Sequence, residues 1–408
     1  MFKKRVENTQ GPISGMVWRR FCRNPLAMGS LVFILLGILT ATLGYLISPD
    51  STPHANHQQL EIATHKPGHE ATLVLVAKNQ PQITKSFLER LVSGLPSGYN
   101  TIAIQHYWFE GEWLNYETYV GQPGYSGLES RIWLPDVAFS IEPGQESVPA
   151  LNDSITFITY TGLKVTKPID QLRETVRQQH IVSRKFLLGT DRFGRDLLSQ
   201  LIIGARVSMS VGFISVFISL VIGLTLGSAG GYFRGWIDDI IVWLINVIWS
   251  IPTLLLVIAI TFAIGKGFWQ VFVAVGLTMW VEVARVARGQ VLSIREKEYV
   301  GAAKALGLSS TRIIARHILP NIMGPIVVIS AANFASAILI EAGLSFLGIG
   351  VQPPMPSWGT MIREHYGFII LDKGYLAFLP GLLIMLMVLA FMLLGNGLRD
   401  ALDKTPRV

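Results

Sequence analysis

Residues 298–321 read EYVGAAKALGLSSTRIIARHILPN, a basic stretch rich in small residues that lies between two strongly apolar runs. Its first half contains good helix formers, and Gly307 follows at the position where a helix favours a left-handed residue. Ser309 can cap a second helix that runs through Arg312 toward Pro320. The stretch therefore predicts two short helices joined by a bend, outside the lipid and rigidly joined to the next apolar run.

Small residues make the first of these helices thin along one side. The residues that form this side are Ala302, Ala303, Ala305 and Gly307. A thin helix face can enter a groove of another protein, because the two backbones approach closely. On helix chemistry alone, a surface helix without any partner is the alternative.

The composition indicates a membrane protein. The chain has 408 residues, of which 50% are hydrophobic and only 15% are charged, whereas a soluble domain carries about 25% charged residues. The net charge is +7, but the basic residues flank apolar runs instead of forming one basic face. This distribution favours membrane topology over nucleic-acid binding. Because Cys22 is the only cysteine, neither an intrachain disulfide nor a thiolate metal cluster can form.

Six apolar runs reach or approach the roughly 20 residues that a helix needs to cross a membrane. They are Leu26–Ile47, Val207–Ser228, Ile240–Ile264, Phe268–Val283, Ile322–Ile340 and Ala377–Leu394. Pro252 lies inside the third run and should kink that helix or end one of its halves. The fourth run is short and carries Glu282 near its end, so it is the weakest candidate. The first run could be a signal peptide, but its length and the absence of a small-residue cleavage site favour a permanent span.

Lysine and arginine predict the orientation of these spans. The basic residues that precede the first run are Lys3, Lys4, Arg5, Arg19, Arg20 and Arg23. They place the N-terminal segment, residues 1–25, in the cytoplasm. With six spans, the C-terminal tail, residues 401–408, and the basic segment at 298–320 also face the cytoplasm. We therefore expect an all-α, multi-pass membrane protein with cytoplasmic termini.

A long loop, residues 48–186, separates the first two spans and lies outside in this orientation. Alternating apolar runs predict strands, and two further runs read as helices. The strands are expected at 71–77, 101–109 and 154–160, and the helices at 85–92 and 169–180. We expect a small α/β domain that folds on the outer face.

Four histidines cluster just after the first span, beside Glu70. They are His54, His57, His65 and His69, and imidazoles of this kind can bind zinc or nickel. Their segment also contains Pro, Asn, Gln and Gly, so it reads as a flexible tether, which argues against a preformed metal site. We predict no metal site, and metal binding by these histidines stays an alternative.

Four separated motifs resemble the membrane subunits of ABC importers. EYVGAAKALG, followed by nine residues and HILPN, is similar to the "EAA" signature of that family. Gly301 stands where the name-giving glutamate would be, and His317 where an isoleucine is often found. LGTDRFGRDLLSQLIIGARVS (188–208), EAGLSFLGIGVQPPMPSWGTMI (341–362) and LLGNGLRDALD (393–403) resemble the dipeptide, oligopeptide and nickel permease branch. The resemblance covers about half the chain, and the external insert has no counterpart in compact members.

This resemblance implies the permease subunit of an ATP-driven importer in the inner membrane, with a permease core at 187–400. The segment 298–320 would dock on a cytoplasmic ATPase. The residues implied to make this coupling contact are Glu298, Tyr299, Ala302, Ala303, Gly307, Arg312, Arg316 and Pro320. The implied partners are a second homologous permease subunit, two ABC ATPase subunits, an extracytoplasmic substrate-binding protein and membrane lipid. Peptides are the expected substrate, with nickel chelates, glycosides or opines as alternatives.

The chain lacks a nucleotide-binding loop of its own. Its Gly-Lys pair in AIGKGF has Ile260 where the first glycine of a G-x-x-x-x-G-K-[ST] loop belongs. We therefore predict no catalytic residues, no enzymatic activity and no cofactor in this chain, with ATP bound by partner subunits. An ion-gradient-driven carrier and a membrane-anchored receptor acting through its external insert are the rival functions. Ionisable residues are scarce within the spans, which argues against the first of these.

Glu341 has two readings. It could face the translocation path and meet the amino terminus of a peptide. It could instead be a structural carboxylate that snorkels near the outer end of its helix. A second charged group, Asp191, Arg192, Arg195 and Asp196, could order the outer approach to span two. The alternative there is an N-cap formed by Thr190 or Asp191.

Overall fold

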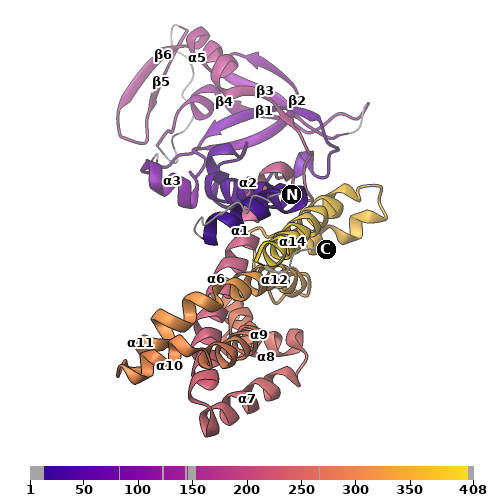
Figure 1. Cartoon of the computed structure of the whole chain (residues 1–408). Coiled ribbons are helices and arrows are strands. Elements are labelled where there is room, and N and C mark those ends of the chain that lie inside the picture. The colour runs from indigo at the N-terminus through magenta and orange to yellow at the C-terminus, as the bar shows by residue number, and fades with distance from the viewer. Residues whose placement is uncertain are drawn as a thin grey trace, which may run out of the picture.

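The computed structural model describes residues 13–81, 83–121, 124–142, 145, 153–265 and 267–402, with side chains described from residue 17 onward. A helical bundle carries a β-rich domain at one end, between its first and second spans (Figure 1). This arrangement confirms the expected fold: a mostly helical membrane protein with a folded insert.

Within the described residues, five helices are long and apolar enough to cross a membrane. They are α2 (Pro25–Ile47), α6 (Leu197–Phe233), α9 (Phe268–Arg295), the continuous helix Ser310–Phe346 and α14 (Tyr375–Leu402). The continuous helix consists of α11 (Ser310–Ile313), a π-helical turn (Ile314–Ile318) and α12 (Leu319–Phe346). The shorter helices of this part are α1 (Ile13–Cys22), α10 (Glu298–Ala305) and α13 (Trp358–His365), and a 3-10 turn follows α13 at Tyr366–Ile369.

The third predicted span is broken. It forms α7 (Gly235–Trp249) and α8 (Thr253–Ile264), which meet at an angle of 95°. Pro252 lies at the start of α8 as the N-cap residue, because proline cannot continue a helix that precedes it. The prediction that Pro252 would end one of the two halves is therefore confirmed.

Packing between α6 and α9 decides whether this broken pair crosses the membrane. A Cβ atom added at Gly223 would lie 2.5 Å from Val283 Cβ, and one added at Gly231 would lie 2.9 Å from Val291 Cβ. Residue numbers on both helices rise together, so α6 and α9 run parallel. The chain must therefore return to the opposite side between them, and α7 with α8 makes that crossing. Counted in this way, the described residues contain six candidate spans.

The fourth predicted run was the weakest candidate for a span, but it forms the most deeply buried of the long helices. The most apolar part of α9 is 67% buried inside the bundle, more than in any other of the five long helices. Glycines on both helices explain this burial, since Gly223 and Gly227 of α6 and Gly276 of α9 let the two helices approach closely. The apolar run ended at Val283 because the second half of α9, which continues to Arg295, carries polar side chains.

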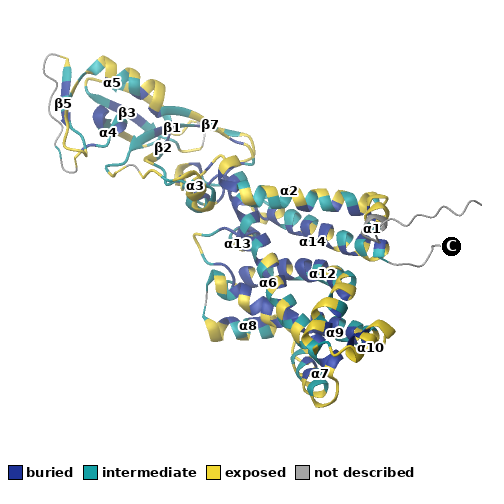
Figure 2. Ribbon diagram, turned by 60° about the vertical axis from the view of Figure 1, so that its left-hand side comes forward, coloured by how far each residue is buried: buried dark blue, intermediate teal, exposed yellow. Residues whose placement is uncertain are grey.

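The remaining spans alternate in direction. Gly37 on α2 faces Met387 on α14, and Gly397 faces Ala27, so these two helices are antiparallel. Phe334 on α12 stacks on Phe391 on α14 with ring centroids 3.8 Å apart. The start of α2 and the end of α14 consequently lie at the same end of the bundle, as Figure 2 shows.

The insert contains a five-stranded antiparallel sheet with the order β4-β3-β2-β1-β7. Its strands are β1 (His69–Ala77), β2 (Tyr99–Glu110), β3 (Trp113–Thr118), β4 (Glu129–Trp133) and β7 (Ile181–Phe186). A separate hairpin is formed by β5 (Ser154–Ile158) and β6 (Lys164–Pro168), and the helices are α3 (Phe87–Ser93), α4 (Leu134–Ala138) and α5 (Ile169–Thr175), which continues as a π-helical turn (Val176–His180). The three predicted strands and two predicted helices are confirmed. One core includes Ile104, Leu114, Phe157 and Leu172, all at most 2% exposed.

The histidine-rich segment, residues 53–69, is ordered and is not a flexible tether. We call it the strap. It includes two short 3-10 turns, Pro53–Ala55 and Leu60–Ile62. The carbonyl of His65 accepts hydrogen bonds from Thr190 N–H at 3.1 Å and from the Tyr375 hydroxyl at 2.7 Å. Ala55 and Ile62 are both 0% exposed and pack in apolar clusters. The strap is therefore fixed by backbone hydrogen bonds to Thr190 and Tyr375 and by buried apolar side chains.

Candidate coupling surface and membrane groove

The bend after α10 has the conformation that its sequence predicts. Gly307 has φ +76°, and its N–H donates to Lys304 O at 2.9 Å. The N–H of Leu308 donates to Ala303 O at 3.2 Å. These two bonds satisfy the last carbonyls of the helix, as in helices that end on a left-handed glycine.

The second half of the segment differs from the prediction in two respects. Ser309 occupies the N-cap position, but its side chain makes no capping hydrogen bond. Pro320 does not end the helix, because the preceding turn is π-helical and Leu319 N–H donates to Ile314 O within it. The wider turn moves the hydrogen-bond ladder past the missing N–H of Pro320. The second half of the segment, from Ser310, and span five are thus one helix.

The faces of α10 have different surroundings. Val300 and Ala303 are 0% and 5% exposed and pack in one cluster with Val291 of α9 and Ile313. Ala303 was predicted on the docking side, but the helical spacing from Val300 turns it inward, so it offers no surface to a partner.

The exposed face of α10, which points away from α9, consists mostly of small residues around the large apolar side chain of Leu306. Leu306 is 81% exposed, and Tyr299 is 45% exposed. The other exposed residues on this face are Glu298, Gly301, Ala302, Ala305 and Gly307. We call these seven residues the docking surface. The sequence reasoning missed Leu306, although an apolar residue directly before a helix-ending glycine was the available signal.

Two arginines extend the docking surface. Arg312 and Arg316 are exposed, and neither has an ion pair among the residues that the structure describes. Nearby basic groups are already engaged: Arg234 pairs with Glu296 at 2.6 Å, and Lys304 lies over the Tyr232 ring at 5.1 Å from its centroid. These contacts tie the inner ends of α6 and α9 together at the base of α10.

A cavity of about 310 Å³ lies against the middle of α9. It is lined by Ile248, Trp249, Thr253, Leu256, Thr278, Met279, Glu282, Ser336, Leu339 and Ile340. A second cavity of about 790 Å³ lies toward the inner end, lined by Val286, Pro320, Asn321, Gly324, Pro325, Val328, Ile329, Ala332, Arg399 and Leu402.

The two cavities follow the same faces of the same two helices. On α9 they are lined at 278, 282 and 286, and on α12 at 328, 332 and 336, in each case four residues apart. Residues at that spacing lie on one side of a helix. We call this combined depression the α9–α12 groove. It extends from the bend at Pro252 to the beginning of α12.

Glu341 does not line the α9–α12 groove. Its side chain is 1% exposed, and its carboxylate accepts hydrogen bonds from the Ser208 hydroxyl at 3.1 Å and the Ser345 hydroxyl at 2.7 Å. Hydroxyl donors inside the bundle replace the water that a snorkelling carboxylate would reach. These surroundings agree with a structural role for Glu341, although its partners are hydroxyls instead of water, and the acid that lines a cavity is Glu282.

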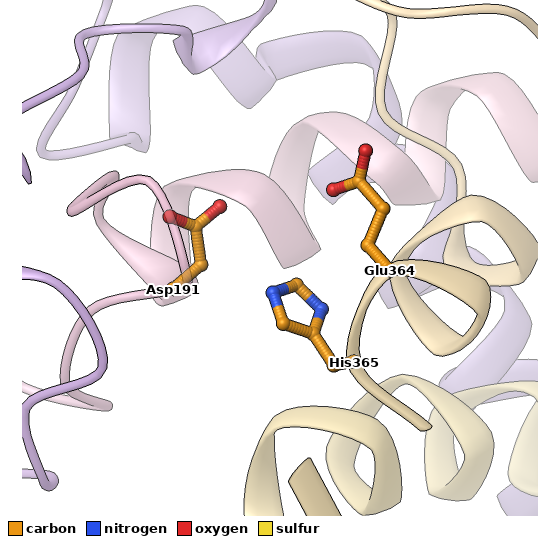
Figure 3. Close-up of side chains that lie close together, drawn as sticks. All are labelled: Asp191, Glu364 and His365. Atoms are coloured by element: carbon orange, nitrogen blue, oxygen red, sulfur yellow. The ribbon is translucent and has the colours of Figure 1, made fainter. Parts of the chain in front are cut away.

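At the end of the bundle that carries the insert, Asp191, Glu364 and His365 converge (Figure 3). Their arrangement could hold a metal ion, but Arg195 already pairs with both carboxylates, reaching Glu364 at 2.8 Å. His365 uses both ring nitrogens: Nδ1–H donates to Met361 O at 2.7 Å, and Nε2 accepts from Arg192 N–H at 3.5 Å. The cluster thus ties the approach to α6 to α13.

The charges at the start of α6 play the ordering role that the sequence predicted. Asp191 accepts hydrogen bonds from the backbone N–H groups of Phe193 and Arg195 at 2.8 and 2.9 Å. The N-cap of α6 is Asp196, whose carboxylate accepts from Ser199 N–H at 2.8 Å. Capping by Thr190 or Asp191 is therefore wrong, because the loop turns once more before the helix begins.

The four histidines of the strap do not converge. His65 and His69 stack with ring centroids 4.0 Å apart, whereas His57 Nε2 lies 2.6 Å from the Thr101 hydroxyl. Burial, followed by the neighbouring His69 and Lys373, lowers the pKa of His65 to about 4. The rings therefore pack as neutral aromatic groups at neutral pH.

Comparison with known proteins agrees with these features. Residues 219–408 match the family described as "Binding-protein-dependent transport system inner membrane component", and residues 14–67 match the "N-terminal TM domain of oligopeptide transport permease C". The range between these two matches contains most of the insert.

Relatives with curated names include three permeases. A dipeptide transport system permease protein DppC of Alkalihalophilus pseudofirmus is 42% identical over 54% of this chain and 72% of its own. A glutathione transport system permease protein GsiD of Pectobacterium atrosepticum is 42% identical over 53% and 71%. The oligopeptide transport system permease protein OppC of Bacillus subtilis is 38% identical over 54% and 72%.

Among solved structures, the MetNI methionine ABC transporter in an inward-facing conformation matches with a TM-score of 0.42 and 19% identity, over 51% of this chain and 98% of that one. The family assignment depends on the sequence relatives. The chain therefore belongs to the OppC/DppC family of ABC transporter permeases and is a multi-pass, non-catalytic inner-membrane subunit of a binding-protein-dependent transport system.

Proposed function

We propose that this subunit forms half of the translocation path of an ATP-driven importer for dipeptides and oligopeptides. Relatives named for dipeptide, oligopeptide and glutathione transport support this substrate class, since all three are peptides. The subunit would pair with a second homologous permease and two ABC ATPase subunits, and would receive substrate from an extracytoplasmic binding protein.

The proposed orientation places both termini and α10 in the cytoplasm. Basic residues gather around the inner ends of α9 and α12: they are Arg285, Arg288, Arg295, Lys297, Lys304, Arg312 and Arg316. Segments rich in lysine and arginine stay on the cytoplasmic side. The insert would then lie outside, where the binding protein approaches.

The observation that carries the proposal is the apolar surface around Leu306. Leu306 is 81% exposed, and an apolar group flanked by small residues on a rigid helix suits a protein cleft. We assign the docking contact to Leu306 together with Glu298, Tyr299, Ala302 and Gly307. Arg312 and Arg316 would add charge contacts at its edge.

Motion of the docking surface would reach the α9–α12 groove through buried contacts. Val300 and Ala303 pack in one hydrophobic cluster with Val291 of α9. Ile313 and Ile318, near the beginning of α12, belong to the same cluster. Pro320 begins α12 and also lines the groove. A rigid-body shift of α10 would therefore move both walls of the groove.

The test is to purify the complex with its ATPase subunits from cells that express Leu306→Asp. A buried aspartate without a partner is costly, so we expect the ATPase to be lost and ATP-dependent dipeptide uptake into proteoliposomes to stop. Leu128→Asp is the matched control, because Leu128 is 78% exposed in the insert. Retention of the ATPase by the Leu306→Asp complex would refute the docking assignment.

A further inference from the structure

We propose that Glu282 binds the protonated amino terminus of a peptide as it moves along the α9–α12 groove. This proposal rests on the proposed peptide import function and adds a recognition site to it. Glu282 lies in the middle of α9 and lines the smaller cavity of the groove, which we call the upper cavity, next to the bend between α7 and α8. The larger cavity is the lower one.

The surroundings of Glu282 make it a group that awaits a ligand. A carboxylate within a membrane span is costly unless it faces water or a partner. Glu341, another acid in a membrane-spanning helix, has two hydroxyl donors inside the bundle. Glu282 is exposed to the cavity and has no hydrogen bond or ion pair among the described residues.

The nearest cation on the same helix is held elsewhere. Arg285 follows Glu282 by one turn, but its guanidinium lies over the Trp249 ring at 3.8 Å from the centroid. Contact at this distance is a favourable cation–π geometry. Since Arg285 is occupied in this way, it does not pair with Glu282, and the carboxyl group remains open to a ligand.

The cavity around Glu282 suits the end of a peptide. The hydroxyls of Thr253, Thr278 and Ser336 share the cavity with Glu282, and Leu339 and Ile340 supply apolar walls. An ammonium group has three N–H donors and no acceptor, so a carboxylate among hydroxyl oxygens can satisfy it. The cavity volume of about 310 Å³ lies at the lower end of the roughly 300–1,000 Å³ found for small-molecule sites.

The lower cavity continues along the same face and would provide the exit. Its lining between Val286 and Ala332 is mostly apolar, and Arg399 stands at the inner end. Among the described residues that line the two cavities, Glu282 is the one carboxylate. The ammonium group would therefore be held at one level of the membrane and released as the groove changes shape.

The experiment compares a free dipeptide with its N-acetylated analogue in proteoliposomes that contain the whole transporter with saturating binding protein. For each peptide we measure uptake by Glu282→Gln relative to wild type, so that selectivity of the binding protein cancels. We expect uptake of the free dipeptide to fall about tenfold, since a hydrogen bond to a charged group is lost. Uptake of the acetylated peptide should stay near wild type, and Glu282→Asp should restore part of the free-peptide uptake. Asp239→Asn, an exposed acid outside the groove, is the matched control.

A second measurement covers the case in which wild type does not transport the acetylated peptide. Ser336→Cys in a Cys22→Ser background keeps Glu282 and places a thiol in the same cavity. It should react with a water-soluble thiol reagent, transported dipeptide should slow that reaction severalfold, and Glu282→Gln should remove the protection. Labelling that is unaffected by transported peptide while Glu282 is present would overturn the proposal.

The remaining outcomes are also decisive. Equal effects of Glu282→Gln on both peptides overturn the proposal, and so does an unchanged uptake of the free dipeptide. Loss of the second permease subunit from the Glu282→Gln complex would mean that the carboxylate pairs with a cation of that subunit, which also overturns it. Failure of the wild-type complex to take up any peptide would refute peptide import itself, and is therefore distinguishable from failure of the Glu282 assignment.

Discussion

Glu282 and Glu341 are both acids within membrane-spanning helices, but their neighbours differ. Hydroxyls of Ser208 and Ser345 donate to Glu341 inside the bundle, whereas Glu282 lines a cavity. Burial without a partner is unfavourable for a carboxylate, and this cost is avoided in two different ways. One acid is structural, and the other is available for a ligand.

Gly307 has a left-handed backbone conformation, which favours glycine at this position of the coupling segment. Its φ is +76°, and an added Cβ would meet no atom within 4 Å, so Gly307→Leu acts through backbone strain instead of a clash. A left-handed residue with a branched side chain costs about 1–2 kcal/mol. We expect normal membrane insertion, but a roughly fivefold or greater loss of substrate-stimulated ATPase activity. Gly307→Asn tolerates this conformation and should retain most of the stimulation. Wild-type stimulation in Gly307→Leu would rule out its coupling role.

Charge reversal separates two roles for Arg312 and Arg316. If they contact a carboxylate on the ATPase, Arg312→Glu with Arg316→Glu should release the ATPase while the permease keeps its topology. As lipid anchors they would each contribute about 1 kcal/mol through anionic headgroups. We expect release, measured by co-purification. Reversal of the exposed Lys164 and Lys185 of the insert is the control, and misinsertion with a retained ATPase would contradict the coupling role.

His65 makes the outer strap sensitive to acid. Its pKa in the folded protein is about 4, and an unfolded histidine titrates near 6.5. The unfolded chain therefore binds more protons between these values, so the free energy of unfolding should fall as pH drops through this window. Because His65 is only partly buried, solvent screening limits the effect to the order of 1 kcal/mol.

Thermal unfolding of the purified protein at pH 7 and pH 4.5 measures this effect. His65→Asn should lose less stability on acidification than wild type, since it lacks the titrating ring. His317→Asn is a control on the opposite side of the bundle. An equal loss in wild type and His65→Asn would show that other groups dominate the acid response.

At the scale of elements, the insert has its own core. Leu114 and Phe157 are 0% exposed and belong to one cluster that joins the sheet, the β5–β6 hairpin and α5. We expect residues 48–186, expressed alone, to unfold cooperatively. Leu114→Ala should reduce the free energy of unfolding by about 2–5 kcal/mol through loss of packing.

Circular dichroism during denaturant titration is the measurement for the insert. A random-coil spectrum of the isolated segment would mean that the strap contacts to Thr190 and Tyr375 are needed for folding. The surface variant Leu128→Asp should leave the transition unchanged and serves as a control for the core variant.

At the scale of the whole molecule, the parallel packing of α6 and α9 requires a crossing by α7 and α8. In a Cys22→Ser background, cysteines at Trp236 and Ile264, which are 72% and 47% exposed, should react with a membrane-impermeant thiol reagent from opposite sides. Leu306→Cys should label from the same side as Trp236→Cys. Labelling of both Trp236→Cys and Ile264→Cys from one side would mean that the broken pair is a re-entrant loop.

The sequence by itself determined the elements whose cause is local. Apolar length predicted the spans, alternation predicted β1, β2 and β5, and the need for a left-handed residue predicted the bend at Gly307. The family motifs were also recognised in the sequence, because each consists of a short run of consecutive residues. Short strands such as β4 and β6 were missed, since too few residues alternate in them to produce a pattern.

Only the tertiary structure decided what each side chain faces. Ala303 and Leu306 are three residues apart, yet one is 5% and the other 81% exposed, because α9 and the base of α12 cover one side of α10. The same holds for Glu282 and Glu341, whose roles depend on neighbours from helices far away in sequence. The α9–α12 groove exists only where two helices lie side by side, and a one-dimensional pattern contains no record of that contact.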